Sequence, residues 1–152
     1  MSIFSSSVCR CLCLLLPWLS VALPVYAGLD NPISASTADG QPLTTITQHA
    51  DGTRSQQILT PQGNLVTEYA TGQGQVFALT WNGNAPPDLR QLLGATRFAA
   101  LQSASAQGGL HAAAQSGQDI EVRIVAATRQ FSGAAWAPSL LPAGFDPRTL
   151  AP

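Results

Sequence analysis

The chain contains no lysine and carries little charge of either sign. Its seven basic side chains, all arginine, face eight carboxylates, and the formal net charge is −1 over 152 residues. Nucleic acids and anionic membranes bind proteins that have a basic excess, so this balance argues against both as partners. A Walker-type phosphate loop is excluded as well, because that motif requires a lysine.

The first 27 residues have the three-part pattern of a secretory signal peptide. A polar opening carries Arg10, the mostly apolar run Cys11–Leu23 follows, and small residues lead to an expected cleavage between Ala27 and Gly28. We therefore expect residues 1–27 to be removed and the rest to be exported. The apolar run is shorter than the roughly 20 residues of a membrane-spanning helix. An uncleaved anchor is the alternative, and it would be the protein's membrane contact.

Cysteine is absent outside this leader. Cys9, Cys11 and Cys13 all lie within it, so the expected mature chain, Gly28–Pro152, has none. That chain can form no disulfide and no thiolate metal site. It must be held together by one packed core, for which its length is sufficient.

Glycine recurs at nearly even spacing through the first half of the mature chain, each time in a turn-like context. The positions are Gly40, Gly52, Gly63 and Gly74. Short segments rich in β-branched and aromatic residues separate them, which predicts antiparallel strands joined by tight turns. The expected strands are Leu43–Gln48, Arg54–Thr60, Asn64–Ala70 and Gln75–Trp81. An array of repeats is the weaker alternative, because the units share no long motif.

One helix is expected next. Asp88 follows two prolines and can cap the first turn, with Gln91 in the third helical position of a capping box. The apolar stripe that begins at Leu89 has helical spacing, but Phe98 falls on the opposite side. Either the helix is buried on two sides or Gly94 breaks it. We expect it to run on and to fray over Ala104–Gln107.

The second half predicts two more strands, Asp119–Ala127 and Gln130–Trp136, after a mobile connection over Ser103–Gln118. The fold class is therefore α+β: an antiparallel meander of about four strands, one packed helix and two C-terminal strands. The expected organisation is a flexible segment over 28–42, a single domain over 43–136, and a proline-rich tail over 137–152. That tail should be an extended wrap or a loose end.

Two parts of the chain resemble a known family of small exported proteobacterial proteins. The matching runs are Gly63–Tyr69, Val76–Trp81 and Pro87–Gly94, followed by Phe131–Gly133 and Pro138–Gly144. The family is DUF2844, a domain of unknown function. The resemblance implies an exported single-domain protein from a Gram-negative bacterium, and it carries no activity, cofactor or site residue with it.

The residue patterns do not predict a catalytic, cofactor or metal site. His49 and His111 are the two histidines, and neither stands in a metal-binding or hydrolase motif. Asp119 and Glu121 would share one strand face and could share a proton if buried. A solvated polar face explains them better.

Glu68 is a further candidate acid, next to Tyr69 in the expected strand Asn64–Ala70. It could be buried, but we expect it to pair with Arg90 or to face solvent. For Asp88, helix capping is a sufficient explanation and no catalytic role is needed.

Three aromatic residues, Phe77, Trp81 and Trp136, are candidates for the lining of a ligand or partner groove, although core packing is the simpler interpretation.

The leading hypothesis is an exported, periplasmic or secreted, non-catalytic module that binds an envelope protein or a surface component, with an open sheet edge as the contact. The alternatives are a carrier of a small apolar ligand between sheet and helix, lined by Trp81 and Phe77, and a hydrolase of envelope or matrix polymers.

Overall fold

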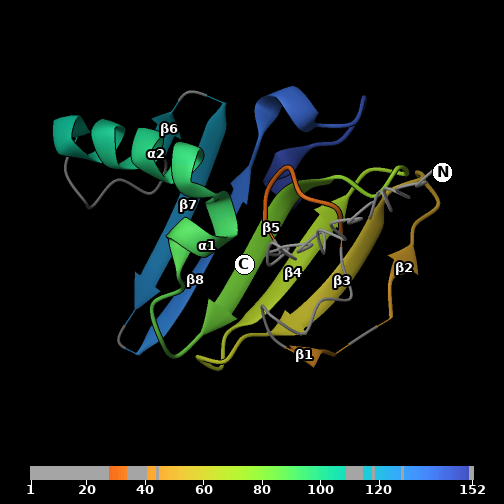
Figure 1. The fold of residues 1–152 in the computed structure, drawn as a ribbon, viewed down its shortest axis with the longest axis horizontal. Helices are drawn as coiled ribbons and strands as arrows, with labels where there is room; N and C mark the ends of the chain where they lie inside the picture. Colours follow the sequence, from red (N-terminus) through yellow and green to blue (C-terminus); the bar gives the residue numbers. More distant parts are fainter. Residues whose placement is uncertain are drawn as a thin grey trace, which may run out of the picture.

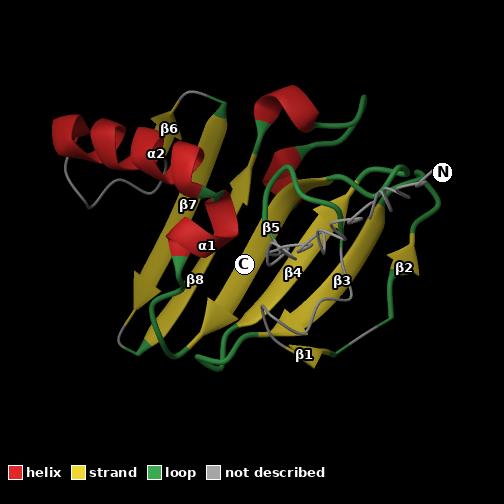
Figure 2. Ribbon diagram, in the orientation of Figure 1, coloured by secondary structure: helices red, strands yellow, loops and turns green. Residues whose placement is uncertain are grey.

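The structure, a computed structural model, describes residues 28–33, 41–43, 45–108, 115–117, 119–127 and 129–150. Its centre is an eight-stranded sheet in which every pairing is antiparallel (Figures 1 and 2). The order across the sheet is β1-β3-β4-β5-β8-β7-β6, and β2 also pairs with β3. The expected α+β class is confirmed, with more strands than predicted.

The strand bounds agree with the sequence prediction in the middle of the sheet and differ at its edges. The long strands are β3 (Arg54–Leu59), β4 (Leu65–Ala70), β5 (Val76–Gly83), β7 (Ile120–Ala127) and β8 (Gln130–Trp136). The edges add β1 (Gln41–Pro42), β2 (Thr47–Gln48) and β6 (Gln115–Gly117). The predicted strand Leu43–Gln48 is therefore reduced to its last two residues. Its first part leaves the sheet after Leu43, whose N–H donates to the carbonyl of Gln57 at 2.9 Å.

Three hairpin turns of one design connect β2, β3, β4 and β5. In each turn a glycine in the left-handed region donates its N–H to the carbonyl three residues earlier, at 2.8 to 3.0 Å. The glycines are Gly52 (φ 82°), Gly63 (φ 81°) and Gly74 (φ 92°). A type I turn closed by a left-handed glycine bulge has this pattern, and it matches the twist of the flanking strands. The even glycine spacing therefore correctly predicts an antiparallel meander over β2 to β5.

The helical region is broken in two. Asp88 caps α1 (Leu89–Leu93), and Gly94, with φ 78°, ends it before α2 (Ala95–Gly108) begins. The expectation of one continuous helix is wrong, and Gly94 resets the phase so that Leu93 and Leu101 both reach the same core. Part of the expected mobile connection is regular structure as well, because Ser103 to Gly108 is helical and Gln115–Gly117 is a strand, while residues 109–114 and 118 lie outside the described residues.

The two faces of the sheet are covered by different parts of the chain. Figure 1 shows α1 and α2 on one face, over β8 and β7. The core on this face is formed by α1 and Leu101, by strand residues such as Trp81 and Val122, and by Leu29 from the N-terminal side. On the other face, Phe77, Ala78, Ala134 and Trp136 pack against residues of the C-terminal segment, including Phe145 and Leu150. In the described part of the chain, no helix is long and apolar enough to cross a membrane.

The described parts of both terminal segments make specific contacts with the sheet and with α1. In the segment expected to be flexible, Leu29 is buried, and Leu29 and Asp30 donate backbone N–H groups to Leu92 and Val76 at 3.0 and 2.8 Å. The C-terminal segment does wrap the sheet, but it also forms two 3-10 turns, Pro138–Leu140 and Pro147–Thr149. Residues 34–40 and 151–152 lie outside the described residues.

The conformation of Gly63 gives a test of the turn design. A Cβ at this position would meet nothing within 4 Å, so a substitution is opposed by the backbone alone. We expect Gly63→Ala to lower the free energy of unfolding by about 1 kcal/mol, and Gly63→Asn to lower it less, because asparagine tolerates the left-handed region. Urea unfolding measures both. Equal stability of the three proteins would contradict this account of the turn.

Candidate functional site

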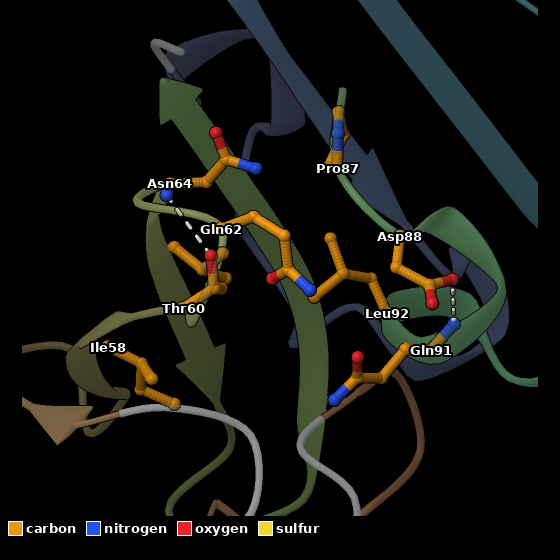
Figure 3. A pocket seen from close by; sticks show the side chains of 9 residues that line it. Ile58, Thr60, Gln62, Asn64, Pro87, Asp88, Gln91 and Leu92 are labelled. Carbon is orange, nitrogen blue, oxygen red and sulfur yellow. Dashed lines mark hydrogen bonds between the residues drawn. The ribbon is translucent and has the colours of Figure 1, made fainter. Parts of the chain in front are cut away.

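A small pocket lies where the β3–β4 hairpin meets the start of α1 (Figure 3). Its lining is formed by Ile58, Thr60, Gln62, Asn64, Val66, Pro87, Asp88, Gln91 and Leu92. In Figure 3 the Gln62 side chain extends toward α1. The cavity volume is ≈ 20 Å³, which is enough for about one water molecule. The pocket is therefore a seam between hairpin and helix and is too small for an apolar ligand of ordinary size.

Polar groups at this seam set the local structure. The carboxylate of Asp88 accepts the backbone N–H of Gln91 at 3.0 Å, which caps α1 as the sequence indicates. The backbone N–H of Asn64 donates to the hydroxyl of Thr60 at 3.1 Å and closes the hairpin. Asn64 is 1 % exposed, and its Oδ1 has no hydrogen-bond partner among the described residues. Asp88 therefore caps α1 on one side of the seam, and Thr60 closes the β3–β4 hairpin on the other.

The three candidate groove aromatics do not all lie on one side of the sheet. Trp81 is 1 % exposed and belongs to the helix-covered core, while Phe77 and Trp136 belong to the core on the other face. The prediction that they share one groove is wrong, and so is the idea that Phe77 and Trp81 line one ligand space. A bulge in β5 opposite Tyr69 and Ala70 shifts the register, so that simple alternation along β5 misassigns Phe77.

Each aromatic has a packing partner instead. A Cβ on Gly133 would lie 2.3 Å from Cζ2 of Trp81, so the indole rests directly on the backbone of β8. The ring of Phe77 meets that of Phe145 edge to face, with centroids 4.8 Å apart. The guanidinium carbon of Arg123 lies 5.5 Å from the centre of the Trp136 ring. Core packing is therefore the role that these contacts support.

Arg123 also holds the C-terminal segment in place. Its Nη2 donates to the carbonyls of Pro147 and Leu150 at 3.3 and 3.2 Å. The sequence predicts a solvated polar face here, and the structure instead places the Arg123 side chain between β7 and this segment. The charge is used to bind two carbonyl oxygens that would otherwise lose water when the segment packs.

One polar cluster joins five separate parts of the chain, with Arg97 at its centre. We call Asp30, Gln75, Arg97, Asp119 and Ser139 the Arg97 cluster. Nη2 of Arg97 lies 3.4 Å from Asp30 and 3.2 Å from Asp119. Gln75 donates to Asp30 at 2.6 Å, and Ser139 donates to Asp119 from its backbone at 3.0 Å and from its hydroxyl at 2.7 Å. The cluster ties both terminal segments to α2 and the sheet.

Both acids of this cluster have a left-handed backbone, with φ 72° at Asp30 and 54° at Asp119. Asp119 lies in the β6–β7 turn, before the first residue of β7. The prediction that Asp119 and Glu121 share a strand face is therefore wrong. Hydrogen bonds from Ser139, together with the Arg97 guanidinium, hold the pKa of Asp119 below its usual value. A lowered pKa here is explained by structural contacts and implies no catalytic role.

The pKa of Asp119 predicts how stability varies with pH. Because the pKa is lowered in the folded state, its stabilisation is present above the unfolded-state pKa of about 3.9 and is lost as the pH falls through the folded value. We expect Asp119→Asn to cost about 1 kcal/mol of unfolding free energy at neutral pH and nothing at strongly acidic pH. Urea unfolding of both proteins across the pH range measures the difference.

Asp119→Ala is the matched control. Like Asp119→Asn it removes the carboxylate, but alanine tolerates the left-handed backbone at this position less well than asparagine does. We expect its curve to run parallel to that of Asp119→Asn, lower by a constant amount at every pH. A cost for Asp119→Asn that is the same at neutral and acidic pH would show that the carboxylate charge is not its source.

Among the described residues, the remaining candidate acids and bases lie in different parts of the sheet. Nε2 of His49 lies 2.8 Å from the hydroxyl of Ser55 at an exposed position, and His111 lies outside the described residues. Glu68 is completely buried on β4, opposite Gln56 and Leu79, so the expectation that it faces solvent is wrong. Among the described residues, no three histidine, cysteine, aspartate or glutamate side chains gather in a way that could hold a metal ion.

The outer edge of β7 is only partly paired by the described strands. β6 pairs with β7 only over Ile120–Val122, and no other described strand lies along the stretch Arg123–Ala127, which we call the β7 edge. Figure 1 shows β6 at one end of β7 and the rest of that outer side uncovered by any labelled element. Ile124 and Val125 in this stretch are 39 % and 51 % exposed.

One residue in the sequence of β7, Val125, indicates the β7 edge, although the alternation of polar and apolar residues makes it easy to miss. In β7 the apolar positions alternate with Glu121, Arg123 and Val125, and Val125 breaks the polar series. Val125 is apolar on the otherwise polar face of β7, and Ile124 is apolar on the other face. Apolar residues on both faces are typical of a strand that is covered on both faces or that pairs with a further strand at its edge. Strand pairing was needed to show which edge is open.

Comparison with known proteins gives one match. The sequence model of a family described as "Protein of unknown function (DUF2844)" matches residues 25–150. The chain belongs to this family. The match covers the whole sheet, both helices and the C-terminal segment through Leu150, so the DUF2844 domain includes both covering layers. No curated protein and no solved structure matches the chain.

Proposed function

We propose that this DUF2844 protein is exported to the periplasm or beyond the cell of a Gram-negative bacterium and binds another protein of the envelope, without catalysing a reaction. The observation that carries the proposal is the β7 edge, where the strand continues for five residues beyond its pairing with β6. Such an edge offers backbone hydrogen-bonding groups to an extended segment of a partner. The exposed side chains of Ile124 and Val125 supply apolar contact on both sides of that segment.

The contrast with the opposite edge of the sheet supports this assignment. There, β1 and β2 both pair with β3, and β1 ends in Pro42. Short strands and proline are the means by which proteins protect a sheet edge from unwanted pairing. The short strand β6 covers β7 only over Ile120–Val122, and the stretch Arg123–Ala127 contains no proline and no lysine.

The export part of the proposal rests on residues 1–27 and is tested separately. We expect the protein, produced with a C-terminal tag in a Gram-negative host, to be recovered from the soluble periplasmic fraction with a mass that begins at Gly28. Intact-mass analysis of each fraction is the measurement. A full-length mass in the inner membrane would contradict cleavage and make the leader an anchor.

The binding part is tested at Val125. We expect the purified protein to capture an envelope protein that slows amide exchange at Ile124 and Ala126, and we expect Val125→Lys to abolish this capture, since an edge charge opposes strand addition. Leu43→Lys is the matched control, because Leu43 is 52 % exposed, close to the 51 % of Val125, but lies beside β1. Equal capture by both variants would refute the β7 edge as the contact.

A further inference from the structure

The residues that follow the expected leader are held against both α1 and β5. The N–H of Leu29 donates to the carbonyl of Leu92 at 3.0 Å, and the N–H of Asp30 donates to the carbonyl of Val76 at 2.8 Å. Leu29 is 3 % exposed and belongs to the core under the helices. The Cα atom of Gly28, one residue earlier, is therefore held in place beside the last turn of α1.

Gly28 lies so close to α1 that a side chain would collide with the helix backbone. A Cβ at this position would lie 2.9 Å from the carbonyl oxygen of Leu92 and 3.1 Å from that of Gln91. A methyl carbon is too close at these distances, whereas the nitrogen of an N–H···O hydrogen bond lies about 2.7–3.2 Å from its acceptor. The place that a Cβ would take is therefore suited to a nitrogen donor.

We propose that removal of the leader puts the new α-ammonium group of Gly28 in this place, where it donates to both carbonyl oxygens. This inference rests on the export part of the proposed function. In the full chain the Gly28 nitrogen is joined to Ala27 by a peptide bond. Cleavage releases this nitrogen, and a third of a turn about the Cα–C bond of Gly28 then moves it to the place of the absent Cβ. Glycine permits this rotation because it has no side chain.

The electrostatics of the last turn of α1 favour a positive charge at this place. The carbonyl end of a helix carries a partial negative charge, and a cation beside it is stabilised. A backbone carbonyl oxygen can accept two hydrogen bonds, so that of Leu92 can accept the ammonium as well as the N–H of Leu29. Hydrogen bonds from a charged donor are stronger than neutral ones. Cleavage therefore supplies a contact with α1 that the unprocessed chain cannot make.

The absence of lysine makes the amino terminus directly measurable. The α-amino group is the single primary amine of a chain that begins at Gly28, so an N-hydroxysuccinimide ester labels it alone. We expect periplasmic protein with that starting mass to react at least about tenfold more slowly when folded than in urea, because the amine must first leave its charge-assisted hydrogen bonds. Intact mass against time measures both rates.

A glycine inserted between Ala27 and Gly28 is the matched variant. Processing after Ala27, checked by intact mass, leaves a terminal glycine whose ammonium is one residue further from α1. We expect this amine to react about as fast in the folded protein as in urea, and we expect the urea midpoint to be lower than that of the natural sequence. A glycine added after Pro152 gives the same mass and should change neither quantity.

The outcomes separate this inference from the proposed function. Equal acylation rates for the folded natural sequence and the folded insertion variant would overturn the inference, and so would an equal loss of stability in both glycine variants. In either case the leader has been removed, so the proposed function stands. A chain that keeps its leader has no amine at Gly28, and this result would overturn both the inference and the export part of the proposed function.

Discussion

Everything in this fold depends on the need to bury both faces of β5. Six consecutive residues of that strand, Val76 to Trp81, are buried, and they include Phe77 and Leu79 on opposite sides. A large apolar side chain contributes about 1.5–3 kcal/mol when it is fully buried. A single sheet cannot supply that burial by itself, so the chain must provide one cover for each face.

The two covers come from distant parts of the sequence, and polar contacts hold them in place. The break at Gly94 lets α1 and α2 cover β8 and β7, while Leu29 packs beside α1. On the other face, Arg123 binds carbonyls of the C-terminal segment. The Arg97 cluster then connects both covers to each other, since Asp30 precedes the sheet and Ser139 follows it. An apolar surface alone would set no fixed direction for these irregular segments, whereas the hydrogen bonds do.

The sequence determined the middle of the sheet well and its boundaries poorly, for local reasons. The strands β3, β4, β5, β7 and β8 were predictable because glycine turns and alternating side chains are short-range signals. The side of the sheet that Phe77 occupies was not, because a one-residue bulge reverses the alternation. β6 and the order of the C-terminal segment depend on partners far along the chain. The same holds for the candidate site. The Asp88 cap could be predicted from neighbouring residues, but the β7 edge could be identified only from the strand pairing, which shows that β6 covers three residues of β7.

The position of Leu150 has a consequence for the time at which the molecule can fold. This residue is 3 % exposed, follows every strand of the sheet in the sequence, and closes the face that holds Phe77 and Trp136. That face of β5 is therefore covered by residues that are distant from it along the chain. Contacts of large sequence separation form slowly relative to local helices and turns. The glycine hairpins and the capped first turn of α1 can therefore form before this side of the core is closed.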